Sequence, residues 1–237
     1  MKYSLNLKLS DNCLDEKGNI SPYEVFCLFQ QAANVHGEML GVSFEEMKSK
    51  NLLWVVSRTY YEAFASAANG QEVVVTTWPL SPTRLGYERD YTVCDKDGNV
   101  IIKGSSNWAL IYADTRHLAI VPNLYNTDNL CENRAFEYRI KRIRGFEGEY
   151  LNEKIIPCES MIDCNGHVNN TYYAQFTQNA IGSFEARIKS FQVDFHREVM
   201  CGQPLNMCVA SDGEKTLVKG ENSDGELMFC AAVEYDN

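Results

Sequence analysis

Residues 163–170, Asp-Cys-Asn-Gly-His-Val-Asn-Asn, gather polar groups just before a predicted helix. The imidazole of His167 can hold or pass a proton near neutral pH, and Asp163 can act as base, nucleophile or orienting group. A helix start also favours negative charge and presents unpaired backbone N–H groups. The segment therefore suits a reaction in which a carbonyl oxygen becomes an oxyanion. The expected donors to that oxyanion are the backbone N–H groups of Val168, Asn169 and Asn170.

Other interpretations compete for the same segment. Asn, Asp and Gly are common in turns and helix caps, where they carry no chemistry. A calcium loop is excluded, because its sixth and twelfth positions require Gly and Glu, and here they are Val168 and Ala174. Residues 169–171 form a glycosylation sequon, which has no meaning in a cytosolic chain.

An internal repeat favours the chemical interpretation. The residues from Leu14 align without gaps on those from Ile162, and two later landmarks repeat in the same order. Matched pairs are Asp15 with Asp163, Gly18 with Gly166, Gly70-Gln71 with Gly202-Gln203, and Asp97-Gly98 with Asp224-Gly225. The first copy has Lys17 and Asn19 where the second has Asn165 and His167. Either version satisfies a turn, so we interpret the second copy as active and the first as a decayed partner retained for packing and substrate binding.

Each copy reads as one long helix followed by strands. The first helix starts at Ser21 with an N-cap, a proline and a capping-box Glu, and Gly41 stops it; the first copy has extra residues around 41–51. In the second copy Asn169 takes the place of Ser21, before an apolar stripe of Tyr172, Phe176, Ala180 and Phe184. Strands are predicted over 52–64, 71–79, 85–95, 99–113, 188–199, 204–211, 215–222 and 226–235. The pattern predicts an α+β duplication with copies at 1–133 and 155–237 and a connecting segment at 134–154.

Composition limits the class of partner and the compartment. A net charge of −10 and a pI near 4.9 argue against binding to duplex nucleic acid or to anionic membranes. No apolar run approaches the 18 or so residues of a membrane span, and the polar alternation of the first residues excludes a signal peptide. Nine cysteines without a Cys-x-x-Cys pair indicate reduced thiols. We expect a cytoplasmic protein with no metal and no cofactor.

Four segments together resemble one protein family. They are NLLWVVSR (51–58), GSSNWALIYADTRHLAIVP (104–122), HVNNTYYAQF (167–176) and VDFHREV (193–199). In this order they are similar to the acyl-[acyl carrier protein] thioesterases in their compact bacterial form, over about residues 3 to 235. The resemblance implies a tandem double hotdog, in which two helix-in-sheet units form an internal pseudo-dimer with an acyl tunnel at their junction.

The resemblance also implies the catalytic residues. By motif match these are Asp163, Asn165 and His167 in the loop before the second helix, and Glu198 on the following strand. Plant relatives carry a Cys directly after that Glu, where this chain has Val199, so a thiol mechanism at that position is impossible. From the polar cluster and the resemblance, we expect Asn165 and His167 to orient the thioester and a water that Glu198 or Asp163 activates. Direct attack by Asp163 through a mixed anhydride is the alternative.

Substrate binding is expected on two further sets of residues. Candidate walls of the acyl tunnel, each of which could equally be plain core, are Val25, Phe29, Ala32, Met39, Trp54 and Val56. A basic run between the copies could bind the acidic acyl carrier protein or be a solvated linker. Its candidate docking residues are Arg139, Lys141, Arg142 and Arg144.

The resulting expectation is a hydrolase that releases free fatty acid from acyl-[acyl carrier protein] and so ends fatty-acid synthesis. The alternatives are an acyl-CoA thioesterase of the same fold, a hotdog 3-hydroxyacyl dehydratase and a non-catalytic acyl-binding module. A homodimer on top of the internal pseudo-dimer is a further possibility.

Overall fold

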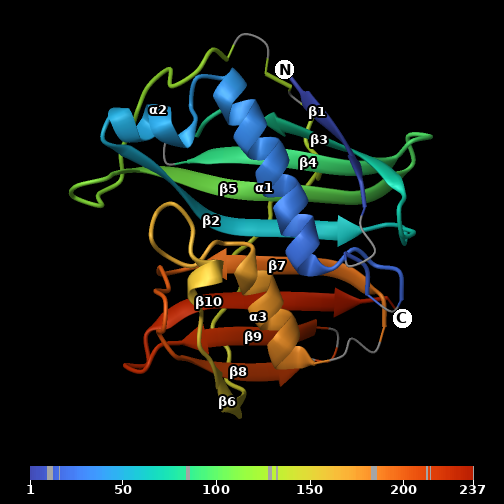
Figure 1. Cartoon of the computed structure of the whole chain (residues 1–237), viewed down its shortest axis with the longest axis vertical. Coiled ribbons are helices and arrows are strands. Elements are labelled where there is room, and N and C mark those ends of the chain that lie inside the picture. Colours follow the sequence, from blue (N-terminus) through green and yellow to red (C-terminus); the bar gives the residue numbers. More distant parts are fainter. Residues whose placement is uncertain are drawn as a thin grey trace.

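The computed structural model describes residues 1–9, 13–15, 17–83, 86–127, 130–131, 133–182, 186–211, 213 and 215–236. Its strands form one antiparallel sheet, with the helices α1 and α3 against one face (Figure 1). The strands are β1 (Tyr3–Lys8), β2 (Leu52–Ala63), β3 (Glu72–Pro79), β4 (Tyr87–Asp95), β5 (Val100–Tyr112), β6 (Glu149–Ile155), β7 (Ile188–Phe195), β8 (Leu205–Ser211), β9 (Lys215–Glu221) and β10 (Leu227–Tyr235). The helices are α1 (Pro22–Met39), α2 (Phe44–Ser49), the short 3₁₀ helix η1 (Glu159–Met161) and α3 (Tyr172–Ile181).

The sheet is a duplication built around its central pair of strands. Its order, β1-β3-β4-β5-β2-β7-β10-β9-β8-β6, consists of two five-stranded units joined where β2 pairs with β7. At the middle of that pairing Tyr60 faces Gln192, a separation of 192 − 60 = 132 residues. Gly70 and Gly202 are separated by the same number of residues and have φ of 70° and 74°. The predicted α+β tandem of helix-on-sheet units, the double hotdog, is therefore confirmed.

The helix starts follow local capping chemistry. Ser21 accepts a hydrogen bond from the Glu24 N–H at 3.3 Å, and Pro22 opens α1 as predicted. The extra residues of the first copy form α2, which begins with a complete capping box. Helix α3 begins three residues after Asn169, whose side chain accepts from the backbone and hydroxyl of Thr171 instead of capping the helix directly. Phe184 of the predicted stripe lies outside the described residues.

The predicted strands are present, with differences at three places. Strand β7 ends at Phe195, so Glu198 lies in the segment after the strand and not on it. The other two are β1 and β6, the outermost strands of the sheet, which the sequence did not predict. All of strand β6 except its last residue, Ile155, lies in the predicted connecting segment, and the strand is exposed along nearly its whole length, so it carries no apolar alternation to mark it.

The core of the first unit is closed where α1 crosses the sheet. The Phe29 ring stacks on Tyr91 with centroids 4.2 Å apart, and an added Cβ at Gly104 would lie 2.2 Å from the same ring. Glycine at this position of β5 thus lets the helix approach the strand directly. At Phe29, α1 therefore packs directly on the sheet.

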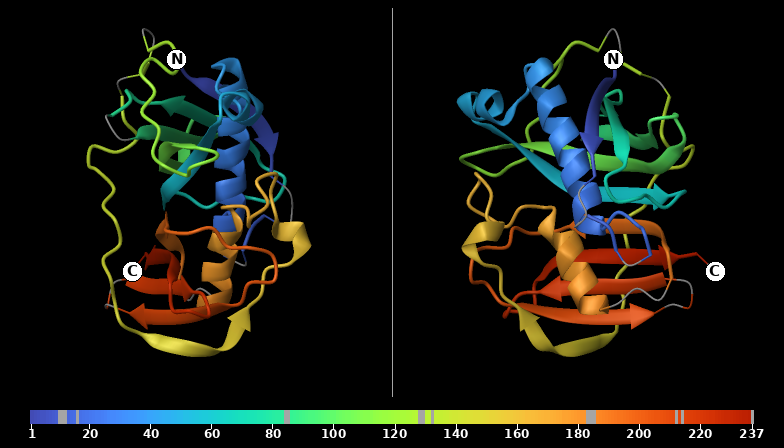
Figure 2. Two further views of the ribbon diagram at one scale, coloured as in Figure 1. Left: turned by 90° about the vertical axis from the view of Figure 1, so that its left-hand side faces the viewer. Right: turned by 45° about the vertical axis from the view of Figure 1, so that its right-hand side comes forward.

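The segment 134–148 runs across the face of the sheet opposite the helices (Figure 2). Phe191 and Val193 belong to the helix-side core, so Gln192 and Asp194 point to the other face. There the Gln192 side chain donates to the Lys141 carbonyl, and Asp194 accepts from the Ile143 N–H. A buried ion pair of Arg58 with Asp194, 2.5 Å long, joins β2 to β7 beneath the segment. No helix among the described residues is long and apolar enough to cross a membrane.

Candidate active site

The loop before α3 is a tight turn organised by Asp163. The Asp163 N–H donates to the His167 carbonyl at 2.9 Å, the Gly166 N–H donates back to the Asp163 carbonyl, and Gly166 has φ of 85°. The Asp163 carboxylate accepts from the Asn165 N–H at 2.8 Å. Because glycine adopts a positive φ without steric cost, Gly166 is the residue that allows this turn.

The first copy contains the same turn with a different closing residue. Asp15 accepts from two backbone N–H groups, and the Asn19 side chain donates to it at 2.7 Å. In the second copy His167 stands where Asn19 stands, and its Nδ1 lies 3.8 Å from Asp163 Oδ1, beyond hydrogen-bond distance. The second loop thus lacks a bond that closes the first loop and has an imidazole instead.

That imidazole lies between two carboxylates. His167 Nε2 is 3.4 Å from Glu198 Oε1, on the side away from Asp163. The Glu198 segment is held beside the loop because the Val168 N–H donates to the Val199 carbonyl at 2.8 Å. Glu198 also forms an ion pair with Arg116, which comes from the first copy. The structure therefore brings three of the predicted residues, Asp163, His167 and Glu198, into one row.

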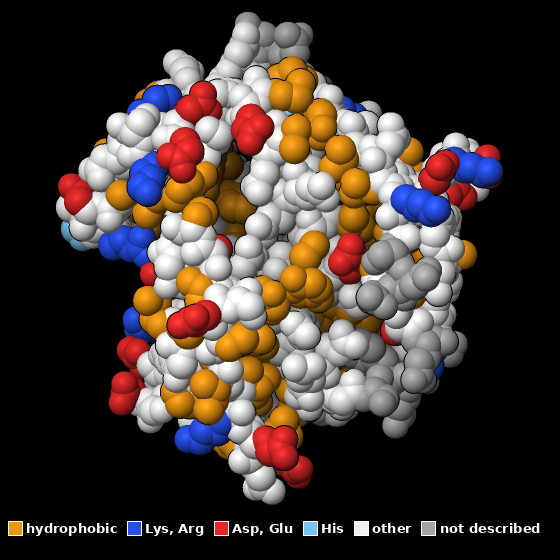
Figure 3. Space-filling view, in the orientation of Figure 1, with side chains coloured by type: hydrophobic (Ala, Val, Ile, Leu, Met, Phe, Trp, Pro, Cys, Tyr) orange, Lys and Arg blue, Asp and Glu red, His pale blue; other side chains and the backbone are white. Residues whose placement is uncertain are grey.

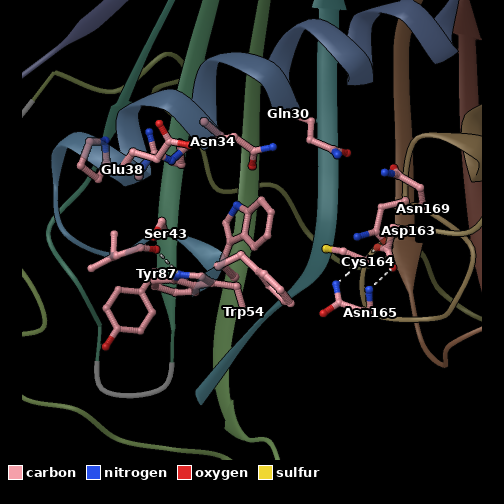
Figure 4. Close-up of a pocket in the computed structure, with 18 of the residues that line it drawn as sticks. Gln30, Asn34, Glu38, Ser43, Trp54, Tyr87, Asp163, Cys164, Asn165 and Asn169 are labelled. Carbon is pink, nitrogen blue, oxygen red and sulfur yellow. Dashed lines mark hydrogen bonds between the residues drawn. The ribbon is translucent and has the colours of Figure 1, made fainter. Parts of the chain in front are cut away.

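A cavity of about 530 Å³ opens beside this loop. Figure 3 shows a hollow with hydrophobic side chains between α1 and α2, and Figure 4 shows residues 163–165 at one end of the cavity and Trp54 and Tyr87 farther along it. Asp163 and Asn165 line the cavity, whereas His167 and Glu198 are not among the lining residues. The described lining is Gln30, Ala33, Asn34, Gly37, Glu38, Val42, Ser43, Phe44, Trp54, Pro79, Tyr87, Glu88, Arg89, Trp108, Tyr125, Asp163, Cys164, Asn165, Asn169 and Asn170.

The predicted oxyanion donors are mostly occupied. The Val168 N–H donates to Val199 and the Asn169 N–H donates to the Met161 carbonyl at 2.9 Å. The prediction is therefore wrong for these two groups, because the loop uses them to hold its own neighbours. No described residue accepts from the Asn170 N–H, and Asn170 lines the cavity.

The predicted tunnel walls are only partly in place. Trp54 lines the cavity, but Met39 is 64% exposed and is not a wall. Val25, Phe29, Ala32 and Val56 are buried core residues outside the cavity lining. The reason is the direct contact of α1 with the sheet, which leaves the cavity to the adjoining helix face with Gln30, Ala33, Asn34, Gly37 and Glu38.

The candidate docking residues lie away from the cavity. Arg139, Lys141, Arg142 and Arg144 are all exposed, and they belong to the segment on the face of the sheet opposite α1 and α3. The structure therefore does not bring them to the candidate site.

Two residues that the sequence did not single out are close to the site. Arg116 is 82 positions from Glu198, and no spacing rule connects residues so far apart. The Cys164 thiol lines the cavity, and burial together with the Asp163 charge raises its pKa.

Cys201 donates toward the Pro157 carbonyl and is exposed. Among the described residues, no group of His, Cys, Asp and Glu could hold a metal ion.

Comparison with family models gives two successive matches. Residues 1–128 match the model of the acyl-ACP thioesterase N-terminal domain, and residues 148–235 match that of the acyl-ACP thioesterase C-terminal domain.

Curated relatives include plant enzymes. The chain is 28% identical over 186 residues to a chloroplastic palmitoyl-acyl carrier protein thioesterase of Arabidopsis thaliana, covering 73% of this chain and 44% of the relative. It is 25% identical over 216 residues to a chloroplastic dodecanoyl-[acyl-carrier-protein] hydrolase of Umbellularia californica, covering 84% and 55%. The chain thus spans about half the length of the curated relatives it matches.

Solved structures show the same fold at low identity. An acyl-ACP thioesterase from Bacteroides thetaiotaomicron superposes with a TM-score of 0.90 at 21% identity, covering 99% of this chain and 98% of that chain. The 12:0-ACP thioesterase from Umbellularia californica superposes with a TM-score of 0.87 at 22% identity, covering 99% and 97%.

Proposed function

The chain belongs to the acyl-ACP thioesterase family, and on that premise we propose that it hydrolyses the thioester of acyl-[acyl carrier protein] to free fatty acid. The names of its relatives support this choice of substrate. The observation that carries the proposal is the imidazole of His167 between the carboxylates of Asp163 and Glu198, beside a cavity. The first copy has the same turn without the imidazole, so the turn itself does not need it.

In the proposed reaction the acyl chain enters the cavity and the thioester carbonyl lies at the end lined by Asp163, Asn165 and Asn170. The Asn165 amide and the Asn170 N–H stabilise the oxygen that becomes negative. Glu198 or Asp163 accepts a proton from the attacking water, whose oxygen bonds to the carbonyl carbon. The carbon–sulfur bond then breaks, and the proton passes from that carboxyl through His167 to the departing thiolate. The products are a carboxylate and the thiol of the carrier.

Asp163 as a nucleophile is the alternative route. Its oxygen would attack the carbonyl carbon and expel the thiolate, and water would then cleave the mixed anhydride. Single-turnover hydrolysis in heavy-oxygen water tests this route. Label in Asp163 requires an anhydride that water opens at the Asp163 carbon, whereas label found only in the fatty acid fits both direct attack by water and opening of the anhydride at its acyl carbon.

Cys164 is not part of the proposed mechanism. Only the thiolate is a nucleophile, and the raised pKa of this thiol keeps it protonated near neutral pH. Cys164→Ser is expected to keep kcat/KM within about threefold of the parent chain, since a hydroxyl fits the same space. A loss comparable to that of His167→Ala would contradict the exclusion of a thiol route.

The main test is a thioesterase assay on carrier proteins loaded with acyl chains of increasing length, with His167→Ala as the inactive control. Matched acyl-CoA substrates decide whether the carrier protein or CoA is preferred. Loss of water from 3-hydroxyacyl chains with an intact thioester would support a dehydratase instead. Binding of acyl chains without turnover would support a non-catalytic module.

The docking of the carrier is tested separately. Because Arg142 and Arg144 lie on the face opposite the cavity, charge reversal at both is expected to change hydrolysis of carrier-bound chains by less than about twofold. A loss that is confined to carrier-bound substrates and strongest at low salt would assign docking to this segment.

The proposed function includes a division of the chain into three parts: a substrate-binding copy at 1–133, a connecting segment at 134–154 and a catalytic copy at 155–237. A cytoplasmic location and a homodimer stay predictions.

A further inference from the structure

We infer that Arg116 is a positioning residue for the proposed reaction, and that the first copy supplies it to the catalytic loop of the second. The inference rests on the proposed function. The Nη2 of Arg116 donates to Glu198 Oε1, the same oxygen that lies 3.4 Å from His167 Nε2. No hydrogen bond from a described residue reaches the other oxygen of Glu198.

The two contacts on one oxygen orient the carboxylate. Glu198 lies in the irregular segment after β7, and its side chain is 40% exposed, so no surrounding core holds it. The His167 contact by itself is too long to fix the carboxylate. The guanidinium of Arg116, a planar donor group that stays charged, therefore sets which oxygen faces His167.

Arg116 itself is held by a constrained turn at the end of β5. Its φ is 60°, a left-handed conformation that is unusual for a residue with a side chain. Its N–H donates to the Tyr112 carbonyl at 2.9 Å, and the Ala113 N–H donates to the Asn51 carbonyl at 2.9 Å. Hydrogen bonds from the Asn51 side chain and the Thr115 N–H lower the pKa of Asp114 and keep it charged inside the turn. A strained conformation that the surroundings hold in place is common at functional sites.

The ion pair of Arg116 with Glu198 contributes little to the stability of the fold. Both partners are nearly half exposed, and such pairs stabilise a fold little. The pair also joins residues 82 positions apart, from the two copies of the repeat. Its main effect is therefore on the position of Glu198 relative to His167.

The chain offers a matched control. Arg197 is also an exposed arginine, 58% exposed, and it pairs with Glu226 at 3.2 Å. It is the sequence neighbour of Glu198, so Arg197→Ala removes the same charge near the same carboxylate without touching the pair.

The experiment measures kcat and KM of Arg116→Ala on a thioester that the parent chain hydrolyses. We expect kcat to fall roughly ten- to a hundredfold, as for a misplaced catalytic group, with KM within about twofold. Millimolar guanidinium should restore kcat, since the site is exposed, whereas sodium chloride at equal ionic strength should not. Arg197→Ala should match the parent. In a Glu198→Gln background, Arg116→Ala should cost nothing further, because its partner charge is gone.

Several outcomes overturn the inference. These are an Arg116→Ala variant with the parent's kcat, a loss expressed in KM, a loss that guanidinium does not rescue, and a full additional loss in the Glu198→Gln background. Should Arg116→Ala fail to fold, Arg116→Gln replaces it under the same criteria. A parent chain that hydrolyses no thioester would contradict the proposed function. An active parent whose kcat does not change on Arg116→Ala would contradict only the inference on Arg116.

Discussion

Replacing His167 by Asn gives the second loop the closing residue of the first. In the first copy the Asn19 side chain donates to Asp15 at 2.7 Å, and in the second the imidazole makes no hydrogen bond to Asp163. The substituted Asn should form the missing bond, because the two turns share their backbone hydrogen bonds. We therefore expect His167→Asn to make the protein more stable and less active.

The magnitudes follow from the contacts. A hydrogen bond to a charged group contributes about 1.5–3 kcal/mol when it is well buried. Asp163 and His167 have side-chain exposures of 15% and 16%, so solvent reduces this gain to the order of 1 kcal/mol. For a domain of this size, 1 kcal/mol raises Tm by about 2–4 °C. Loss of the general acid should lower kcat by about 10²- to 10⁴-fold.

The reverse substitution, Asn19→His, is the control. It removes the bond that closes the first loop, where Asn19 is buried, so it should lower Tm by more than His167→Asn raises it and leave kcat unchanged. Thermal unfolding and a steady-state thioesterase assay on both variants measure the two effects. Our reasoning is refuted if His167→Asn keeps its activity, or if Asn19→His abolishes activity while the fold remains intact.

Three further predictions concern stability. Gly104→Ala should destabilise the fold by about 1–3 kcal/mol in denaturant titrations, because its Cβ would lie 2.2 Å from the Phe29 ring; an unchanged midpoint would contradict this packing. Arg58→Met should cost about 3–5 kcal/mol, because it leaves the Asp194 carboxylate buried without its cation, and adding Asp194→Asn should recover part of the loss. Burial, with the Arg89 charge beside it, lowers the pKa of His36 from 6.5 to about 4. The unfolded chain then binds the proton first, so stability should fall as the pH drops from about 6.5 to about 4, by on the order of 3 kcal/mol. His36→Gln should flatten that part of the curve, and an equal slope in both proteins would contradict the assignment.

The sequence predicted the fold to the extent that local signals mark its elements. Eight strands with apolar patterning and the start of α1 at Ser21 were found where local rules place them. Strand β6 was missed because it is exposed along nearly its whole length and carries no apolar alternation. Strand β1 does alternate, with Tyr3, Leu5 and Leu7 on its more buried side, but this alternation was used only to exclude a signal peptide. Strand β7 was predicted too long because no Gly, Pro, Asn or Asp marks a turn within residues 196–199, whereas the chain leaves the sheet after Phe195.

Local patterns predicted the candidate site only where its residues are close in sequence, and Glu198 was predicted only through the family resemblance. Asp163 and His167 share one turn, and turn chemistry with the repeat singles them out. The tunnel residues were misplaced because helical periodicity identifies the buried face of α1 but not whether that face meets side chains or empty space. Phe29 fills this space, and the cavity lies over the neighbouring face with Ala33 and Gly37.

The docking segment shows a related limit. A run of basic residues gives a local charge, but the side of the sheet on which it lies depends on long-range contacts. Here Gln192 and Asp194 hold residues 141 and 143 on the face opposite the helices. These partners are about 50 positions away, and no local pattern reports such pairing.

The tandem arrangement explains how one fold holds two different loops. In a symmetric dimer of identical chains, a substitution that opens one turn opens both, and the loss of stability is doubled. In a single chain the first turn can keep Asn19 and its bond to Asp15, while the second turn gives up that bond for His167. The same asymmetry lets Arg116 of the first copy serve Glu198 of the second without a reciprocal contact. Swapping the residues at both positions, Asn19→His with His167→Asn, should therefore abolish the activity, and the stability should fall below that of the parent because the bond lost at the buried Asn19 outweighs the bond gained at residue 167. The swapped chain would have its imidazole in the copy whose partner positions lack Glu198 and Arg116.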